Sequence, residues 1–126
     1  MLVLDSGGVS RLSKRDQETA ALLISLRRRG LWPAIVPTVV LTESLTGSAH
    51  RDTNTNRFLK ACDLRSSVSE RVARRAAELR TKARKGSAID ALVVAIAEPG
   101  RTVLTSDGED LRALSSNATG VSVEVV

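Results

Sequence analysis

Met1-Leu2-Val3-Leu4-Asp5 is the stretch from which the rest of the chain can be interpreted. Its apolar residues run into an aspartate, and Ser6-Gly7-Gly8 then interrupts the pattern. A short apolar run bounded by glycine is typical of a strand buried on both faces in a parallel sheet. Open α/β sheets bind their ligands in the crevice at the carboxyl ends of such strands. We therefore expect Asp5 to lie where a chemical group can act.

Length and cysteine content place the chain in a broad class. Its 126 residues suit one domain, spanning residues 1–126. The single cysteine, Cys62, excludes an internal disulfide and is compatible with a reducing compartment. No apolar run reaches the roughly 18 residues of a membrane span, and no targeting segment is recognisable. We expect a soluble, cytoplasmic protein without a membrane partner.

The charge balance favours polyanionic partners. Lysine and arginine exceed aspartate and glutamate by 19 to 14, and the sequence pI is about 10.3. Nucleic acid or an acidic protein would suit such a chain. Trp32 and Phe58 are the only aromatic residues, which argues against recognition by base stacking. We expect any nucleic acid to be held mainly through its phosphates.

Strand and helix patterns alternate along the chain. We expect strands at residues 1–5, 31–36, 64–68, 101–105 and 121–125, the last at an edge of the sheet. Helices are expected at residues 9–14, 16–29, 37–46, 53–62, 69–85, 88–98 and 108–114. This alternation predicts an α/β fold with a parallel sheet and right-handed crossovers.

One acidic residue stands out within a helical pattern. Val36, Val39, Val40 and Glu43 are spaced at i, i+3, i+4 and i+7, which places them on one helix face. Because the other three residues are apolar, we expect Glu43 to lie on the inward face.

Four acids are placed at strand ends or on inward helix faces: Asp5, Glu43, Asp90 and Asp107. Each also has a purely structural interpretation. Asp5 could cap the turn after its strand, Asp90 has capping-box spacing from Ser87, and Asp107 could be an N-cap. Glu43 could reach solvent from the end of its helix.

Taken together, the four acids favour a metal site. Neighbouring carboxylates raise one another's pKa unless a cation neutralises them. Oxygen ligands without histidine or cysteine suit Mg²⁺ or Mn²⁺. Such ions can activate water for attack on a phosphodiester, with surrounding basic residues holding the substrate's phosphates.

The chain resembles the PIN-domain ribonucleases, and most closely the VapC-type toxins of bacterial toxin–antitoxin pairs. The resemblance covers essentially the whole chain. It rests on four segments in order: Val3-Leu4-Asp5-Ser6, Thr42-Glu43, Ile89-Asp90-Ala91-Leu92-Val93-Val94-Ala95-Ile96-Ala97 and Val103-Leu104-Thr105-Ser106-Asp107.

The resemblance implies a PIN-like three-layer fold with a parallel sheet of about five strands in the order 3-2-1-4-5. It also implies an Mg²⁺- or Mn²⁺-dependent endoribonuclease acting on structured RNA, often transfer or ribosomal RNA. A homodimer and a cognate antitoxin that blocks the site are further implications. Asp5, Glu43, Asp90 and Asp107 match the acidic quartet, as catalytic and metal-binding residues. The resemblance also implies supporting roles for Ser6, Thr105 and Asp110. The Gly7-Gly8 pair differs from the Ser- or Thr-containing loop that is commoner after the first acid in this family.

The helix at residues 69–85 carries a basic face that is a candidate RNA track. Its members are Arg71, Arg74, Arg75, Lys82 and Lys85. A run of charges like this one is more often an ordinary solvated helix face.

Two other functions stay open. A phosphotransfer receiver or a haloacid-dehalogenase-type phosphatase would also place an aspartate at a strand end. The phosphatase pattern needs a second aspartate two residues on, where this chain has Gly7, and a receiver needs a further acid near Asp5. The other alternative is a non-catalytic RNA- or protein-binding module.

Overall fold

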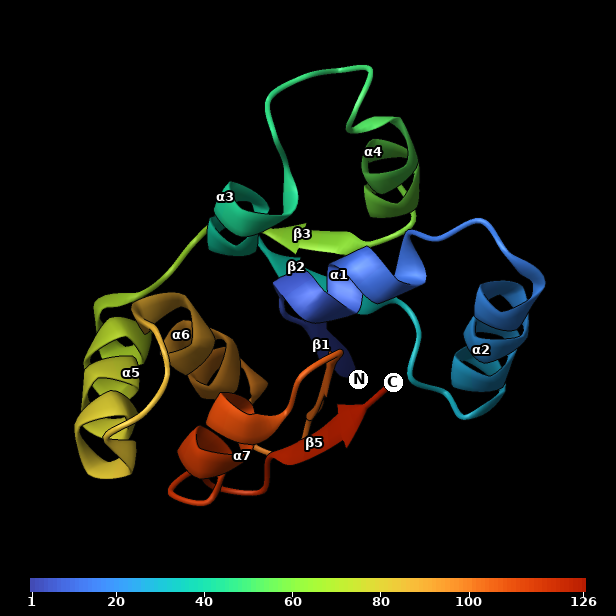
Figure 1. Cartoon of the computed structure of the whole chain (residues 1–126). Helices are drawn as coiled ribbons and strands as arrows, with labels where there is room; N and C mark the ends of the chain where they lie inside the picture. The colour runs from blue at the N-terminus through green and yellow to red at the C-terminus, as the bar shows by residue number, and fades with distance from the viewer.

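The computed structural model describes residues 1–126 and contains a five-stranded parallel sheet in the order β3-β2-β1-β4-β5 (Figure 1). The strands are β1 Leu2–Leu4, β2 Ala34–Pro37, β3 Asp63–Arg65, β4 Thr102–Thr105 and β5 Ser122–Val125. Between them lie α1 Ser6–Leu12, α2 Gln17–Arg28, the 3-10 turn η1 Thr38–Val40, α3 Leu41–Ser44, α4 Thr53–Leu59, α5 Glu70–Ala83, α6 Ala88–Ala97 and α7 Glu109–Ser115. The predicted fold class and strand order are confirmed.

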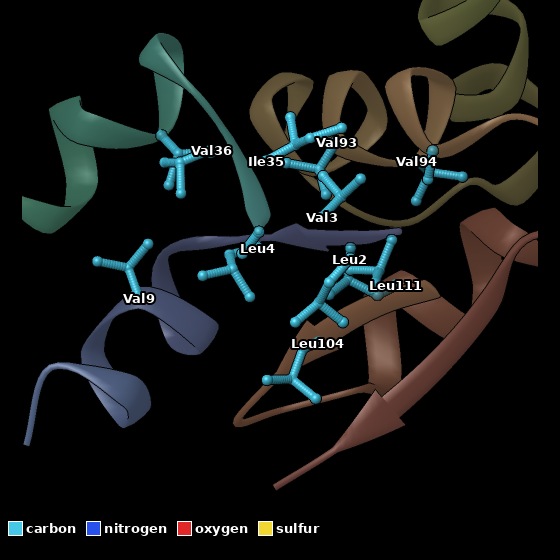
Figure 2. Close-up of a cluster of buried hydrophobic side chains, with 14 of the residues drawn as sticks. Leu2, Val3, Leu4, Val9, Ile35, Val36, Val93, Val94, Leu104 and Leu111 are labelled. Carbon is cyan, nitrogen blue, oxygen red and sulfur yellow. The ribbon is translucent and has the colours of Figure 1, made fainter. Parts of the chain in front are cut away.

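Strand β1 is the central strand and is buried on both faces, as its apolar sequence predicts. Leu2, Val3 and Leu4 are fully buried, and β1 pairs with β2 on one side and β4 on the other. Figure 2 shows Val3 pointing toward Val93 of α6, whereas Leu4 points to the opposite side with Val9 of α1. The fully buried apolar side chains of the chain form one cluster around this strand.

Helix α1 begins directly after β1, earlier than the expected start at residue 9. The Asp5 side chain accepts a hydrogen bond from the Gly8 amide at 2.7 Å, so the helix is capped at once. Glycines are poor helix formers, but here they allow a close approach to β4. A Cβ atom on Gly8 would lie 2.3 Å from the carbonyl oxygen of Leu104. Close packing between α1 and β4 therefore explains the Gly7-Gly8 pair.

Other element boundaries differ by a few residues from those expected. Strand β3 begins at Asp63 and ends at Arg65, because it pairs with β2 in the register Ile35 to Asp63. The predicted helix over residues 69–85 is observed, and Ser69 caps it by accepting from the Val72 amide. Strand β5 is the edge strand, as predicted.

The single helix expected at residues 37–46 is wrong, and so is the inward position of Glu43. The chain forms the 3-10 turn η1 and then one turn of α3, and the Glu43 side chain is exposed. A 3-10 turn advances about 120° per residue instead of about 100°, so the assumed helical periodicity loses phase across η1. Val36, the first residue of the assumed pattern, also lies in β2.

No helix of the structure combines the length and the apolar character that crossing a membrane requires.

Candidate acidic active site

Asp5 anchors the site at the end of β1. Its Oδ1 atom accepts from the Gly8 amide, and its Oδ2 atom accepts from the Thr105 hydroxyl, each at 2.7 Å. The residue is only 7% exposed. Burial raises the pKa of Asp5 above its usual value, and the charge of Asp90 raises it further. The side chain is therefore both an N-cap and a carboxylate that favours a nearby cation.

Thr105 joins the ends of two strands. It is the last residue of β4, and its Oγ1 atom donates to Asp5 and accepts from the Asp107 amide at 3.2 Å. Thr105 thereby sets the path of the segment that carries Asp107. The side chain of Asp107 is exposed and accepts only a long hydrogen bond of 3.3 Å from the Glu109 amide. Gly108, not Asp107, is the N-cap of α7.

Asp90 lies in the first turn of α6. Its Oδ2 atom accepts from the Ser87 amide while the Ser87 hydroxyl accepts from the Asp90 amide, which completes the predicted capping box. The Oδ1 atom of Asp90 accepts no hydrogen bond within the chain. The structural interpretation is thus confirmed for Asp5 and Asp90, and each carboxylate keeps an acceptor position free for another ligand.

All four predicted acids line one pocket of about 300 Å³, although they come from different parts of the chain. Ser6, Thr105 and Asp110 also line it. The pocket contains six carboxylates in total: Asp5, Glu43, Asp90, Asp107, Glu109 and Asp110. No lysine, arginine or histidine lines the pocket, so its potential favours cations.

Known structures resemble the whole chain at low sequence identity. The VapBC2 structure from Rickettsia felis, bound to a DNA fragment from its promoter, aligns with a TM-score of 0.71 and 15% identity, covering 99% of this chain and 98% of that chain. FitAcB from Neisseria gonorrhoeae gives a TM-score of 0.64 and 20% identity, over 97% and 96%. A toxin–antitoxin complex from Klebsiella pneumoniae gives 0.65 and 19%, over 96% and 95%. No family profile and no curated protein matches the chain.

The chain has a PIN-like fold.

The sheet order of the PIN-like fold explains how distant residues come to share the pocket. Strands β1 and β4 are parallel neighbours in the middle of the sheet, so their carboxyl ends meet at the same edge. Asp5 and Thr105 therefore come into contact although 100 residues separate them. Helix α6 packs on β1 and presents Asp90 from its first turn to the same place.

The donor chemistry of the pocket fits a hard divalent cation. The potential ligands are carboxylate and hydroxyl oxygens, which Mg²⁺ and Mn²⁺ prefer. No three acidic, histidine or cysteine side chains converge closely enough to form a complete metal cluster as they stand. Asp107 and Glu43 are exposed and held by few contacts, so their side chains are free to turn toward a cation near Asp5.

Glu109 also lines the pocket, although it is not among the residues predicted from the sequence. It is the first residue of α7 and is paired with Lys85, which follows the end of α5. Its position two residues after Asp107 could have indicated a place in the same pocket. An acid in the first turn of a helix is, however, ordinarily explained by its favourable interaction with the helix dipole.

The predicted basic face of α5 is largely engaged in ion pairs within the chain. Arg74 pairs with Glu70, Lys82 with Glu78, and Lys85 with Glu109. Arg75 is held between Glu98 and Glu78 and also donates to the Asn117 carbonyl. Arg71 alone makes no ion pair, since the residues one turn further along the helix, Arg74 and Arg75, are also cations.

Cys62 is not a candidate nucleophile. Burial raises the pKa of its thiol to about 12, so the reactive thiolate is scarce at neutral pH. The side chain packs against the hydrophobic core.

Proposed function

We propose that this chain is a metal-dependent endoribonuclease and the toxin component of a toxin–antitoxin pair. The observation that carries the proposal is the single pocket into which Asp5, Asp90 and Asp107 project, from the end of β1, the start of α6 and the loop after β4. The known structures with this fold include toxin–antitoxin complexes, which supports the same role here. The cofactor would be Mg²⁺ or Mn²⁺.

In this proposal the chain's own residues divide the work. Asp5, Asp90, Asp107 and Glu43 would hold the cation, which when bound supplies Lewis-acid chemistry at the phosphodiester. The Thr105 hydroxyl donates to Asp5 and accepts from the Asp107 amide, so it holds these two segments at a fixed relative position. The Ser6 hydroxyl lines the pocket without a partner in the chain and is available to orient a water or a phosphate oxygen. Burial and the charge of Asp90 raise the pKa of Asp5, so a neighbouring cation would stabilise its charged form.

The proposed partners follow from the same pocket. A cavity lined by six carboxylates would accept a cationic segment of a cognate antitoxin, which would block access to the site. We also propose a homodimer and a cytoplasmic location. The transfer or ribosomal RNA class is the proposed substrate.

A specific observation disfavours the phosphatase alternative. Position 7 is a glycine whose Cβ would lie 2.5 Å from the Ser106 hydroxyl, so no second aspartate fits there. The binding-module alternative does not explain why six carboxylates line one pocket, where they would repel RNA.

Cleavage of total RNA by the purified protein tests the proposal, with Mg²⁺ or Mn²⁺ and then with chelator. The informative variant is Asp107→Asn, because Asp107 is exposed and caps nothing. Residues that only orient metal ligands contribute about 10- to 100-fold, so loss of a ligand should slow cleavage by at least about 100-fold.

The matched control is Glu18→Gln, an acid that is paired with Arg11 and lies outside the pocket. It should cleave like the unchanged protein. Cleavage that persists in chelator, or in the Asp107→Asn protein, would rule out the proposed site.

A further inference from the structure

A second pocket, of about 370 Å³, lies at the other end of α6. We call it the arginine pocket: Arg65, Arg71, Arg75 and Arg101 line it together with one acid, Glu98. Asp90 stands in the first turn of α6 and Glu98 directly follows its last residue. With a rise of about 1.5 Å per residue, the two pockets are about 12 Å apart along this helix.

The charges in the arginine pocket do not cancel. Glu98 is already engaged, because both of its carboxylate oxygens accept from Arg75 at 2.9 Å. Arg65 has its carboxylate partner, Asp63, outside the pocket lining. Arg101 donates only to the Ile96 carbonyl, and Arg71 has no partner in the chain. At least two of the arginines that line the pocket, Arg71 and Arg101, thus have no carboxylate partner.

The positive character of the pocket comes from these side chains. At the start of α5, the Ser69 hydroxyl already accepts from the Val72 amide. The guanidinium groups come from the end of β3, from α5 and from the start of β4, so elements distant in sequence build the pocket together.

We propose that the arginine pocket binds a phosphate group of the RNA backbone. Guanidinium groups form planar, bidentate hydrogen bonds to phosphate oxygens. No aromatic side chain lines the pocket, so a base would find no stacking partner, whereas a phosphate needs none. An RNA held only at the acidic pocket would be repelled by its carboxylates, and an attachment point about 12 Å away offsets that repulsion.

An acidic protein segment fits the arginine pocket less well. Only three of its eleven lining residues are hydrophobic. Protein partners are usually anchored by buried apolar or aromatic side chains, and this pocket offers little surface for them. The choice of RNA as the polyanion rests on the proposed nuclease function.

Binding of a short fluorescent oligouridylate, measured by anisotropy in chelator at several salt concentrations, tests the proposal. The double variant Arg71→Gln/Arg101→Gln should bind about tenfold more weakly, the effect of about one charge-assisted hydrogen bond. Its log–log salt slope should also be shallower by about 0.7, the value expected for one lost phosphate contact on a single strand.

The control Arg74→Gln/Lys82→Gln removes two positive charges from the same helix but outside the pocket. It should change affinity by less than about twofold, because both residues are paired with glutamates. Equal weakening in both double variants would mean a general charge effect and overturn the proposal, and so would no weakening in either. Displacement of the oligouridylate by poly-glutamate at lower charge concentration would show a protein-docking site instead.

Two features keep the test interpretable. Arg101 supports the end of α6 through the Ile96 carbonyl. The single variant Arg71→Gln, whose exposed side chain makes no hydrogen bond or ion pair, should therefore show the same change of slope. Binding is measured without metal and without cleavage. A protein that binds RNA through the arginine pocket but never cleaves it would refute the nuclease and leave the phosphate site standing.

Discussion

At the scale of single residues, Asp5 has two roles that impose different demands. As an N-cap it accepts from the Gly8 amide, and as a pocket carboxylate it is buried beside Asp90. Burial penalises its charged form, so the position is not optimised for stability of the cation-free protein. Stability sacrificed at a functional position is a common pattern in enzymes.

The pKa of Asp5 predicts a pH-dependent stability difference. The folded chain holds this proton more tightly than the unfolded chain, so the free energy of unfolding falls as pH rises above the ordinary aspartate value of 3.8. Asp5→Asn removes that titration while its amide oxygen still accepts from Gly8. In chelator, urea unfolding should show the variant gaining stability relative to the unchanged protein between about pH 4 and neutrality.

Asp16→Asn supplies a control of opposite sign. Hydrogen bonds from the side chain and the amide of Thr19 lower the pKa of Asp16, so ionisation stabilises the fold there as pH rises. This variant should lose stability relative to the unchanged protein over the same range. A pH-independent difference for Asp5→Asn would contradict the burial that the structure shows.

Gly8 is predicted to tolerate no side chain. Alanine would gain up to about 1 kcal/mol of helix propensity in α1. Its Cβ would however lie 2.3 Å from the Leu104 carbonyl oxygen, and overpacking of this kind costs about 1–3 kcal/mol. Because backbone atoms of β4 cannot move aside cheaply, we expect Gly8→Ala to lower the free energy of unfolding in urea.

Ser10→Ala is the matched control, an exposed position in the same helix. It should keep or slightly raise stability. A Gly8→Ala protein as stable as the Ser10→Ala protein would show that α1 and β4 are less closely packed than the structure indicates.

At the scale of elements, one ion pair ties the amino-terminal half of α5 to the end of α6. Arg75 makes two hydrogen bonds of 2.9 Å to Glu98, whose side chain is only 12% exposed and also accepts from the Thr119 amide. The pair therefore also holds the segment between α7 and β5.

Arg75→Ala would leave the mostly buried carboxylate of Glu98 without its cationic partner. A lost hydrogen bond to a charged group costs about 1.5–3 kcal/mol, and we expect a decrease of this size in the free energy of unfolding. Arg74→Ala, at the preceding position of α5, should have almost no effect because its pair with Glu70 is exposed. Equal losses in the two variants, measured by urea unfolding, would argue against a special role for Arg75.

At the scale of the whole molecule, charges of opposite sign are separated along α6. The carboxylates gather where the central strands end, and the unneutralised arginines gather at the far end of that helix. A chain with a net charge of +5 can thus present a strongly acidic pocket and still attract RNA. This separation cannot be recognised from net charge or from the basic residues of any one helix.

Local patterns determined much of the fold and nearly all of the candidate site. The apolar run before Asp5 predicts a buried strand, and Ser69 and Ser87 mark helix starts that the structure confirms. The order of the acids along the chain predicts Asp5, Asp90 and Asp107 as neighbours, and all three line one pocket. These features can be predicted from the sequence because strand and helix periods, and helix caps, depend on residues only a few positions apart.

Only the tertiary structure decided which side chains are free. It exposes Glu43, adds Glu109 to the pocket, and commits Arg75 to Glu98, 23 residues away, while leaving Arg71 and Arg101 open to a ligand. The phase of the turn after β2 and the pairing of charges depend on how helices pack on the sheet. Such contacts join residues far apart in the chain, so no local period or spacing encodes them.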